Sequence, residues 1–112
     1  PVLFPPPDAA IRPLVERFLV AEGIGPLPRR IETVSGAFGA VYARTTDAIW
    51  IISEGVAAQD LADGRLVALP FDTTLTAGPI GLMTRPDTPA SAASDLFGVA
   101  IRRALAELLP AV

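Results

Sequence analysis

The chain has 112 residues, of which 51% are apolar, and its formal net charge at pH 7 is only -3. This length gives one small domain or a piece of a larger one, and the composition is typical of a folded soluble chain. Because the sequence contains no histidine and no cysteine, it excludes Ser–His and Cys–His nucleophile pairs and zinc sites built on imidazole or thiolate.

All nine cationic residues are arginines, which excludes a Schiff-base lysine and the lysine of a phosphate-binding P-loop. Acid–base catalysis would need carboxylates or the single tyrosine, Tyr42, and no carboxylate spacing points to such a pair. We therefore expect that the chain is not an enzyme and uses no metal and no cofactor. Since the arginines form no basic stripe, we also expect no direct contact between this segment and nucleic acid.

The longest strongly apolar run, Ala48–Ile52, is far too short to cross a bilayer. No charged-then-apolar signal segment opens the chain, so we expect no membrane association and a cytoplasmic protein. The sequence begins at Pro1 and leads directly into an apolar strand. We expect such a chain to be a fragment of a longer one.

The first predicted strand is Val2–Phe4, followed by three prolines and by Asp8, which we expect to be the N-cap of a helix. Pro13 predicts an irregular first turn of that helix, and Gly23 is expected to end it in the left-handed conformation. Its apolar residues have the spacing of one helical face: Ile11, Leu14, Val15, Phe18 and Leu19.

A second strand, Ile31–Val34, leads to Ser35, which is expected to cap a helix through Arg44. The packing residues expected for this helix are Phe38, Val41 and Tyr42. The next strand, Ala48–Ile52, is apolar at every position, as expected for a strand covered on both faces of a parallel sheet. Within it, Trp50 is expected to pack in the core.

Ser53 is expected to cap a third helix, which Gly64 ends. Its inward-facing residues are expected to be Val56, Ala57 and Leu61. Leu66–Leu69 is predicted as a fourth strand. The resulting order, βαβαβαβ, predicts an α/β fold with a parallel sheet, in which ligands bind beyond the carboxyl ends of the strands.

The rest of the chain carries one more predicted strand, Ile80–Thr84, and a last helix. Ser91 is expected to cap this helix, which extends to about Leu109. It has one apolar stripe: Phe97, Ile101, Leu105 and Leu108.

Several segments resemble the LysR-type transcriptional regulators and follow one another in the order of that family: Glu32–Gly39, Thr46–Val56, Gly64–Pro70 and Gly78–Arg85. The likeness covers essentially the whole chain. The opening Leu3–Pro7 and the segment Glu32–Ser35 are most similar to activators of protocatechuate degradation operons within this family.

The resemblance implies one lobe of an effector-binding domain that is itself similar to type 2 periplasmic binding proteins. Residues 1–76 would be the second lobe. Residues 77–112 would be the strand that crosses back, together with a C-terminal helix that normally packs on the first lobe. The resemblance further implies self-association as a dimer and binding of a small carboxylate effector, such as a carboxymuconate.

In this family the first two strand-to-helix turns, together with the crossing strand, line the effector cleft. The resemblance therefore implies these effector-binding residues: Pro6, Pro7, Asp8, Ala9, Ser35, Gly36, Ala37 and Thr84. Free amides at helix N-termini would suit a carboxylate ligand. However, Asp8 and Ser35 are equally explained as N-caps that any α/β domain needs, and Thr84 as part of a hinge.

A carboxylate ligand beside Asp8 would be repelled unless a cation lies close. Arg12 is a candidate for that cation, and the alternative is an exposed arginine that only favours solubility. Gly36 and Gly39 would allow either a ligand or a neighbouring element to approach the backbone. As a function, we expect effector sensing and oligomerisation in a LysR-type regulator of aromatic catabolism, and the alternative is a solute-binding module of the periplasmic type.

Overall fold

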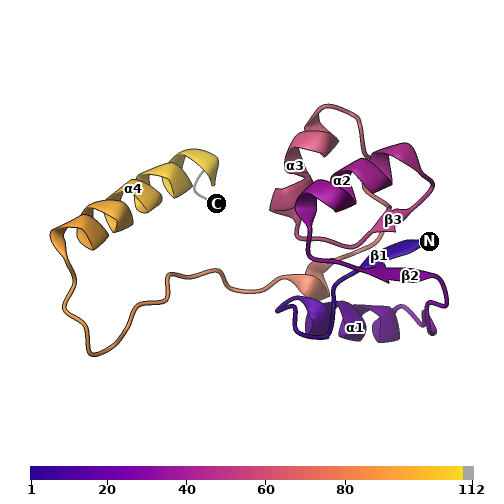
Figure 1. Cartoon of the computed structure of the whole chain (residues 1–112), viewed down its shortest axis with the longest axis horizontal. Coiled ribbons are helices and arrows are strands. Elements are labelled where there is room, and N and C mark those ends of the chain that lie inside the picture. Colours follow the sequence, from indigo (N-terminus) through magenta and orange to yellow (C-terminus); the bar gives the residue numbers. More distant parts are fainter. Residues whose placement is uncertain (110–112) are drawn as a thin grey trace. The chain divides into compact units, whose positions relative to one another are not determined.

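The computed structural model describes residues 1–109, and the chain forms two compact units, Pro1–Gly78 and one that begins at Pro79 (Figure 1). Within the described residues, no helix has the length and apolar character needed to cross a membrane.

The first unit is built on a parallel sheet of three short strands, β1 (Val2–Phe4), β2 (Arg30–Glu32) and β3 (Ile49–Trp50), in the order β2-β1-β3. In the ladder, Leu3 of the central strand lies opposite Ile31 on one side and Trp50 on the other. The side chain of Leu3 is fully buried. The α/β fold with a parallel sheet is therefore confirmed.

Three α-helices surround this sheet: α1 (Arg12–Ala21) covers one face, and α2 (Gly36–Thr45) and α3 (Glu54–Ala62) cover the other (Figure 1). The buried apolar residues come from strand β1 and from all three helices: Leu3, Phe4, Val15, Phe18, Ala43 and Ala57. The core is small because each of these three helices contributes only two buried residues.

Two helices end as the sequence predicts. Gly23 and Gly64 have φ angles of 68° and 69°, in the left-handed region that glycine adopts without strain. Beyond Gly23, the amide of Ile24 donates to the carbonyl of Leu19 at 2.8 Å. Together with the bond from Gly23 N to Val20 O at 3.1 Å, this is the Schellman pattern, which satisfies carbonyls at the helix end.

The start of α1 differs from the prediction. The helix begins at Arg12, its N-cap residue is Ile11, and no side chain caps it, so the prediction that Asp8 is the N-cap is wrong. Residues 7–11 form turns instead, in which the amide of Ala9 donates to the carbonyl of Pro6 at 3.0 Å. Pro13 explains the shift, because a proline has no N–H to donate and fits only the first turn of a helix.

The packing faces of α2 and β3 were also predicted wrongly. On α2 the buried residues are Gly39 and Ala43, whereas Phe38 and Val41 are exposed and Tyr42, the third predicted packing residue, is half-buried. Ile49 of β3 is 45% exposed, so this strand is not covered on both faces within the unit. A prediction from hydrophobic periodicity selects the large apolar residues of a helix. Gly39 is buried instead, because a glycine has no side chain and lets the helix approach the sheet more closely.

In α3, Ala57 is buried as predicted, but Val56 is 51% exposed. Its second buried position is Asp60, a polar residue that hydrophobic periodicity does not select.

The predicted strands Leu66–Leu69 and Ile80–Thr84 are irregular segments in the described structure. After α3, the amides of Arg65 and Leu66 both donate to the carbonyl of Asp60, at 2.8 and 3.2 Å. Leu66 therefore has no amide free for a sheet ladder. An apolar run becomes a strand only when another strand supplies the bonding partners, and residues 80–84 are exposed in this chain.

The segment after Leu69 packs on α1. Phe71 meets Phe18 edge to face, with ring centroids 6.0 Å apart. A short 3-10 helix, η1 (Thr74–Thr76), follows. At its start, the carboxylate of Asp72 accepts a hydrogen bond from the amide of Thr74, at 3.0 Å.

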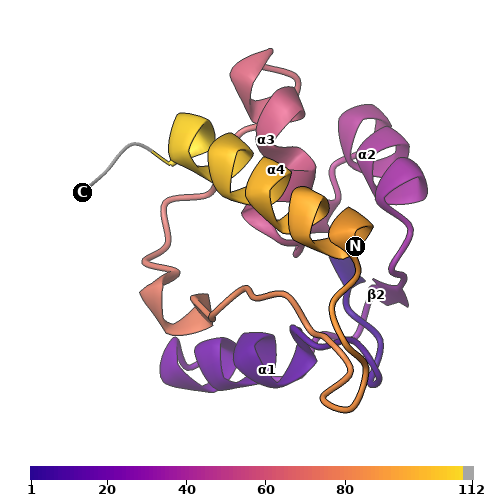
Figure 2. The same cartoon turned by 90° about the vertical axis from the view of Figure 1, so that its left-hand side faces the viewer.

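The second unit contains helix α4 (Ala92–Leu108), one uninterrupted helix in Figure 2. Ser91 caps this helix as predicted, because its hydroxyl accepts a hydrogen bond from the amide of Ser94, at 3.1 Å. The apolar stripe is largely exposed in this chain, with Phe97 at 64% and Leu108 at 76%.

Candidate functional site

Two strand-to-helix turns lie at the same edge of the sheet: the first turn, Pro6–Ala9, follows β1, and the second turn, Ser35–Ala37, follows β2. Since β1 and β2 are adjacent and parallel, their carboxyl ends meet at one edge. A backbone bond from Thr33 N to Phe4 O, 3.1 Å long, joins the two exits. The fold thus brings together seven of the eight candidate residues.

The second turn has the geometry expected of a helix N-terminus. The hydroxyl of Ser35 accepts a hydrogen bond from the amide of Phe38, at 3.1 Å, which confirms the predicted N-cap. The amide of Gly39 donates to the carbonyl of Ser35, so the amides of Gly36 and Ala37 precede the first helical hydrogen bond. Ser35 and Ala37 are exposed, and this end of α2 can accept a hydrogen-bonding anion.

Gly36 packs against α3. A Cβ at this position would lie 3.3 Å from Cγ1 of Val56. The missing side chain therefore makes room for a neighbouring helix. Of the two explanations offered for the glycines of α2, close packing is the one that the structure supports.

The first turn is less open to a ligand. Pro7 and Asp8 are exposed and Pro6 and Ala9 are half-buried. Because the amide of Ala9 is already bonded to Pro6, and because α1 starts four residues after Asp8, the first turn does not present a helix N-terminus.

Arg12 is neither an exposed arginine nor a cation free to bind a ligand. Its side chain is only 11% exposed. The Nε atom donates to Glu16 at 2.6 Å, and Nη1 donates to the carbonyl of Pro5 at 2.8 Å and to the carboxylate of Glu32 at 3.1 Å. These bonds, first of all the one to Glu16 and then the one to Glu32, raise the pKa of Arg12 above its ordinary value.

The guanidinium of Arg12 also lies over the ring of Phe4, 4.6 Å from its centroid. Arg30 approaches the same ring at 5.6 Å and pairs with Glu32 at 3.4 Å. Cation–π contacts of this kind add to the ion pairs. The network could not be predicted from the sequence because its central pair, Arg12 and Glu32, is 20 residues apart in sequence.

Thr84, the eighth candidate, is exposed and lies in the irregular part of the second unit. It belongs to a different unit from the two turns.

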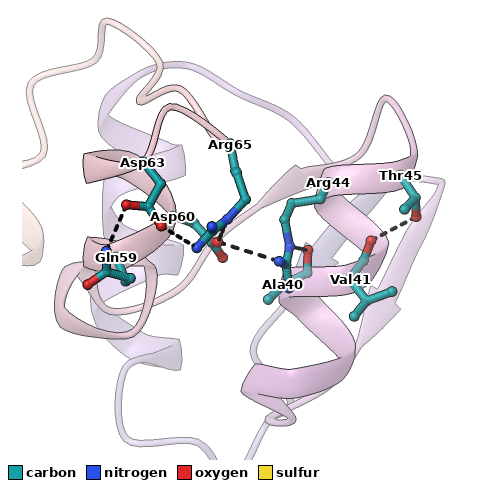
Figure 3. Close-up of polar contacts among 8 residues, drawn as sticks. All are labelled: Ala40, Val41, Arg44, Thr45, Gln59, Asp60, Asp63 and Arg65. Carbon is teal, nitrogen blue, oxygen red and sulfur yellow. Dashed lines mark hydrogen bonds and ion pairs between the residues drawn. The ribbon is translucent and has the colours of Figure 1, made fainter.

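A second polar cluster, also missed from the sequence, joins α2 to α3 (Figure 3). Asp60 is buried, with 7% exposure, and pairs with Arg65 at 2.7 Å and with Arg44 at 3.7 Å. Arg65 also reaches Asp63 at 2.7 Å, and the hydrogen bond to Asp60 is the main cause that raises the pKa of Arg65. Every charge has a partner here, so the cluster serves packing rather than ligand binding.

Two shallow surface depressions lie away from the candidate edge. One, of about 430 Å³, is at the amino end of the strands and is lined by Pro1, Val2, Leu27, Pro28, Arg29 and Asp47. The other lies on the outer face of α1. Among the described residues there is no group of three or more acidic side chains that could hold a metal ion.

The comparisons with known proteins agree with one another. Residues 1–106 match the protein family described as LysR substrate binding domain. The chain is 56% identical over 108 residues to the HTH-type transcriptional regulator PcaQ of Agrobacterium fabrum, and equally to PcaQ of Rhizobium radiobacter. It is 30% identical over 105 residues to the uncharacterized HTH-type transcriptional regulator YdcI of Escherichia coli.

These matches cover 94–96% of this chain but only 34–35% of each relative. The chain thus spans about a third of the length of the curated relatives it matches. No solved structure gives a significant match.

Proposed function

Because this chain belongs to the family of LysR substrate-binding domains, we propose that it senses a small effector for a transcriptional regulator. The effector would lie against the two turns, Pro6–Ala9 and Ser35–Ala37. Residues 1–76 would form the second lobe of the effector domain. Residues 77–112, with Thr84, would cross to a first lobe and pack on it.

The observation that carries this proposal is the N-terminus of α2. The amides of Gly36 and Ala37 lie at the carboxyl edge of the sheet and precede the first helical hydrogen bond. A carboxylate is the ligand that such amides and the helix dipole favour. We therefore propose a small carboxylate effector, and the resemblance to protocatechuate regulators suggests a carboxymuconate.

Regulation would follow from a difference in effector affinity between two arrangements of the regulator. Such a protein acts by binding, and we propose that it has no enzymatic activity. The relatives are named as transcriptional regulators, which gives no support to the alternative of a periplasmic solute-binding module.

The test is isothermal titration of the protein, as its gene encodes it, with a carboxymuconate and with its neutral methyl ester. We expect the free acid to bind and the ester to bind at least about tenfold more weakly. Equal heats for both compounds, or no heat for either, would contradict a carboxylate effector at this edge.

A variant pair locates the site. Ala37 is exposed at the start of α2, so Ala37→Glu places a negative charge where the helix dipole tolerates it but where it repels a carboxylate ligand. Ala58→Glu, at an exposed position of α3, adds the same charge elsewhere. We expect only Ala37→Glu to abolish binding, with both variants folded by circular dichroism.

We also propose that the protein self-associates, as multimers are usual in this family. Sedimentation equilibrium should give a mass at least twice that of the monomer. A monomer at micromolar concentration would contradict this part of the proposal.

A further inference from the structure

We propose that Arg12 is a positioning residue, which fixes the separation of the two turns of the effector site through Pro5 and Glu32. This inference rests on the proposed function, because the two turns form an effector site only if that function holds. Arg12 itself would not touch the effector.

The contacts of Arg12 join the two turns directly. Nη1 donates to the carbonyl of Pro5, the residue immediately before the first turn, at 2.8 Å. The same nitrogen donates to Glu32, the last residue of β2, at 3.1 Å. One guanidinium nitrogen therefore holds the chain at the exit of β1 and at the exit of β2.

The surroundings of Arg12 keep the guanidinium in this position. The side chain is 11% exposed, lies over the Phe4 ring and is oriented by Nε, which donates to Glu16. A guanidinium is planar and directs its N–H groups in fixed directions, whereas a lysine ammonium has one flexible centre. Lysine would keep the charge but could not maintain this set of contacts.

The charges around Arg12 indicate how this residue would affect effector binding. Two arginines, Arg12 and Arg30, meet two carboxylates, Glu16 and Glu32, so the network has no net charge to offer an anion. Its effect on the effector would come through the position of the turns. The amides of Gly36 and Ala37 would be displaced if Glu32 lost Arg12 and kept only Arg30, since only Thr33 and Val34 separate Glu32 from Ser35.

The experiment compares three single variants of the protein as its gene encodes it. Arg12→Lys and Glu32→Gln weaken the side-chain link between the turns and leave the backbone bond from Thr33 to Phe4 in place. We expect each to weaken carboxymuconate binding about tenfold. Glu16→Gln removes the negative charge of a partner of the same guanidinium within α1 but does not change the contacts of Arg12 with Pro5 and Glu32. This variant should bind within about twofold of wild type. The double variant, Arg12→Lys with Glu32→Gln, should bind no more weakly than the weaker single variant.

A second readout does not depend on the effector. Hydrogen exchange of the amides of Ser35 and Phe38, which donate to the hydroxyls of Thr33 and Ser35, should be faster in Arg12→Lys and Glu32→Gln than in wild type, and unchanged in Glu16→Gln. Equal exchange in all four proteins would overturn the proposal, as would undiminished binding by Arg12→Lys and Glu32→Gln. If wild type binds no carboxymuconate while the exchange pattern is as expected, the proposed function fails but the positioning role of Arg12 stands.

Discussion

The indole ring of Trp50 occupies the space that a side chain at Gly39 would need. A Cβ built at Gly39 would lie 2.5 Å from Cε2 and Cζ2 of the indole. Since real Cβ atoms do not approach carbon so closely, the glycine allows α2 to pack directly on β3. This contact places the N-terminus of α2, and with it the second turn, relative to the sheet.

Gly39→Ala should therefore destabilise the protein by about 1–3 kcal/mol, the usual cost of overpacking a core. A loss of stability would be informative, because replacing glycine by alanine in a helix interior otherwise stabilises the helix by up to about 1 kcal/mol. Urea unfolding followed by the fluorescence of Trp50, the single tryptophan, measures the change.

Gly55→Ala is the matched control, because a Cβ at Gly55 in α3 would meet nothing within 4 Å. This variant should be as stable as wild type or more so. If Gly39→Ala were also neutral, the close approach of α2 to Trp50 would not be a constraint on the fold.

The sequence predicted this region only in part. The alternation of strands and helices was visible, and so were the ends of helices marked by Gly23, Gly64, Ser35 and Ser91, because these signals are local. The buried face of α2 was not visible, since Gly39 acts through the absence of a side chain and Trp50 is 11 residues away in sequence.

The predicted strands Leu66–Leu69 and Ile80–Thr84 failed for a related reason. Their composition is apolar, but a strand exists only where another strand offers a hydrogen-bonding edge, and that is not a local property. The two ion networks, centred on Arg12 and Asp60, were missed as well. Charged residues have no periodicity, and only the fold shows which arginine meets which acid.

Asp60 provides a second test, because it is buried and joins α3 to Arg44 of α2. Asp60→Ala should destabilise the protein by about 1.5–3 kcal/mol, the range for hydrogen bonds that involve a charged group. Asp63→Ala removes a more exposed partner of the same Arg65 and should cost less than about 1 kcal/mol. Thermal unfolding of both variants decides the order, and a larger loss for Asp63→Ala would contradict the role assigned to Asp60.

Ser35 and Ser53 form a third comparison, since both occupy N-cap positions but only Ser35 accepts an amide through its hydroxyl. Ser35→Ala should lower the free energy of unfolding by about 1 kcal/mol. Ser53→Ala should change it by less than about 0.5 kcal/mol. Denaturant titration of both variants measures the difference, and equal losses would mean that the Ser35 hydroxyl does not stabilise α2.

The hydrogen bonds of Asp72 predict that the stability of the first unit depends on pH. The carboxylate of Asp72 accepts hydrogen bonds from the hydroxyl and from the amide of Thr74. These bonds, of which the one from the hydroxyl has the larger effect, lower the pKa of Asp72 below its ordinary value of 3.8. A depressed carboxyl pKa contributes stability that is fully present above the unfolded-state value and is lost as pH falls through the lower folded-state value. The affected pH range therefore lies below 3.8.

We expect Asp72→Asn to be less stable than wild type at pH 7, because the amide oxygen is a weaker acceptor than a carboxylate. The difference should shrink as the pH is lowered below 3.8, where Asp72 of the wild type becomes protonated. In a Thr74→Val background, which removes the principal hydrogen bond, the same substitution should alter the pH profile less. Urea unfolding of the four proteins between pH 3 and pH 7 measures this, and a difference independent of pH would show that Asp72 does not stabilise η1 through its charge.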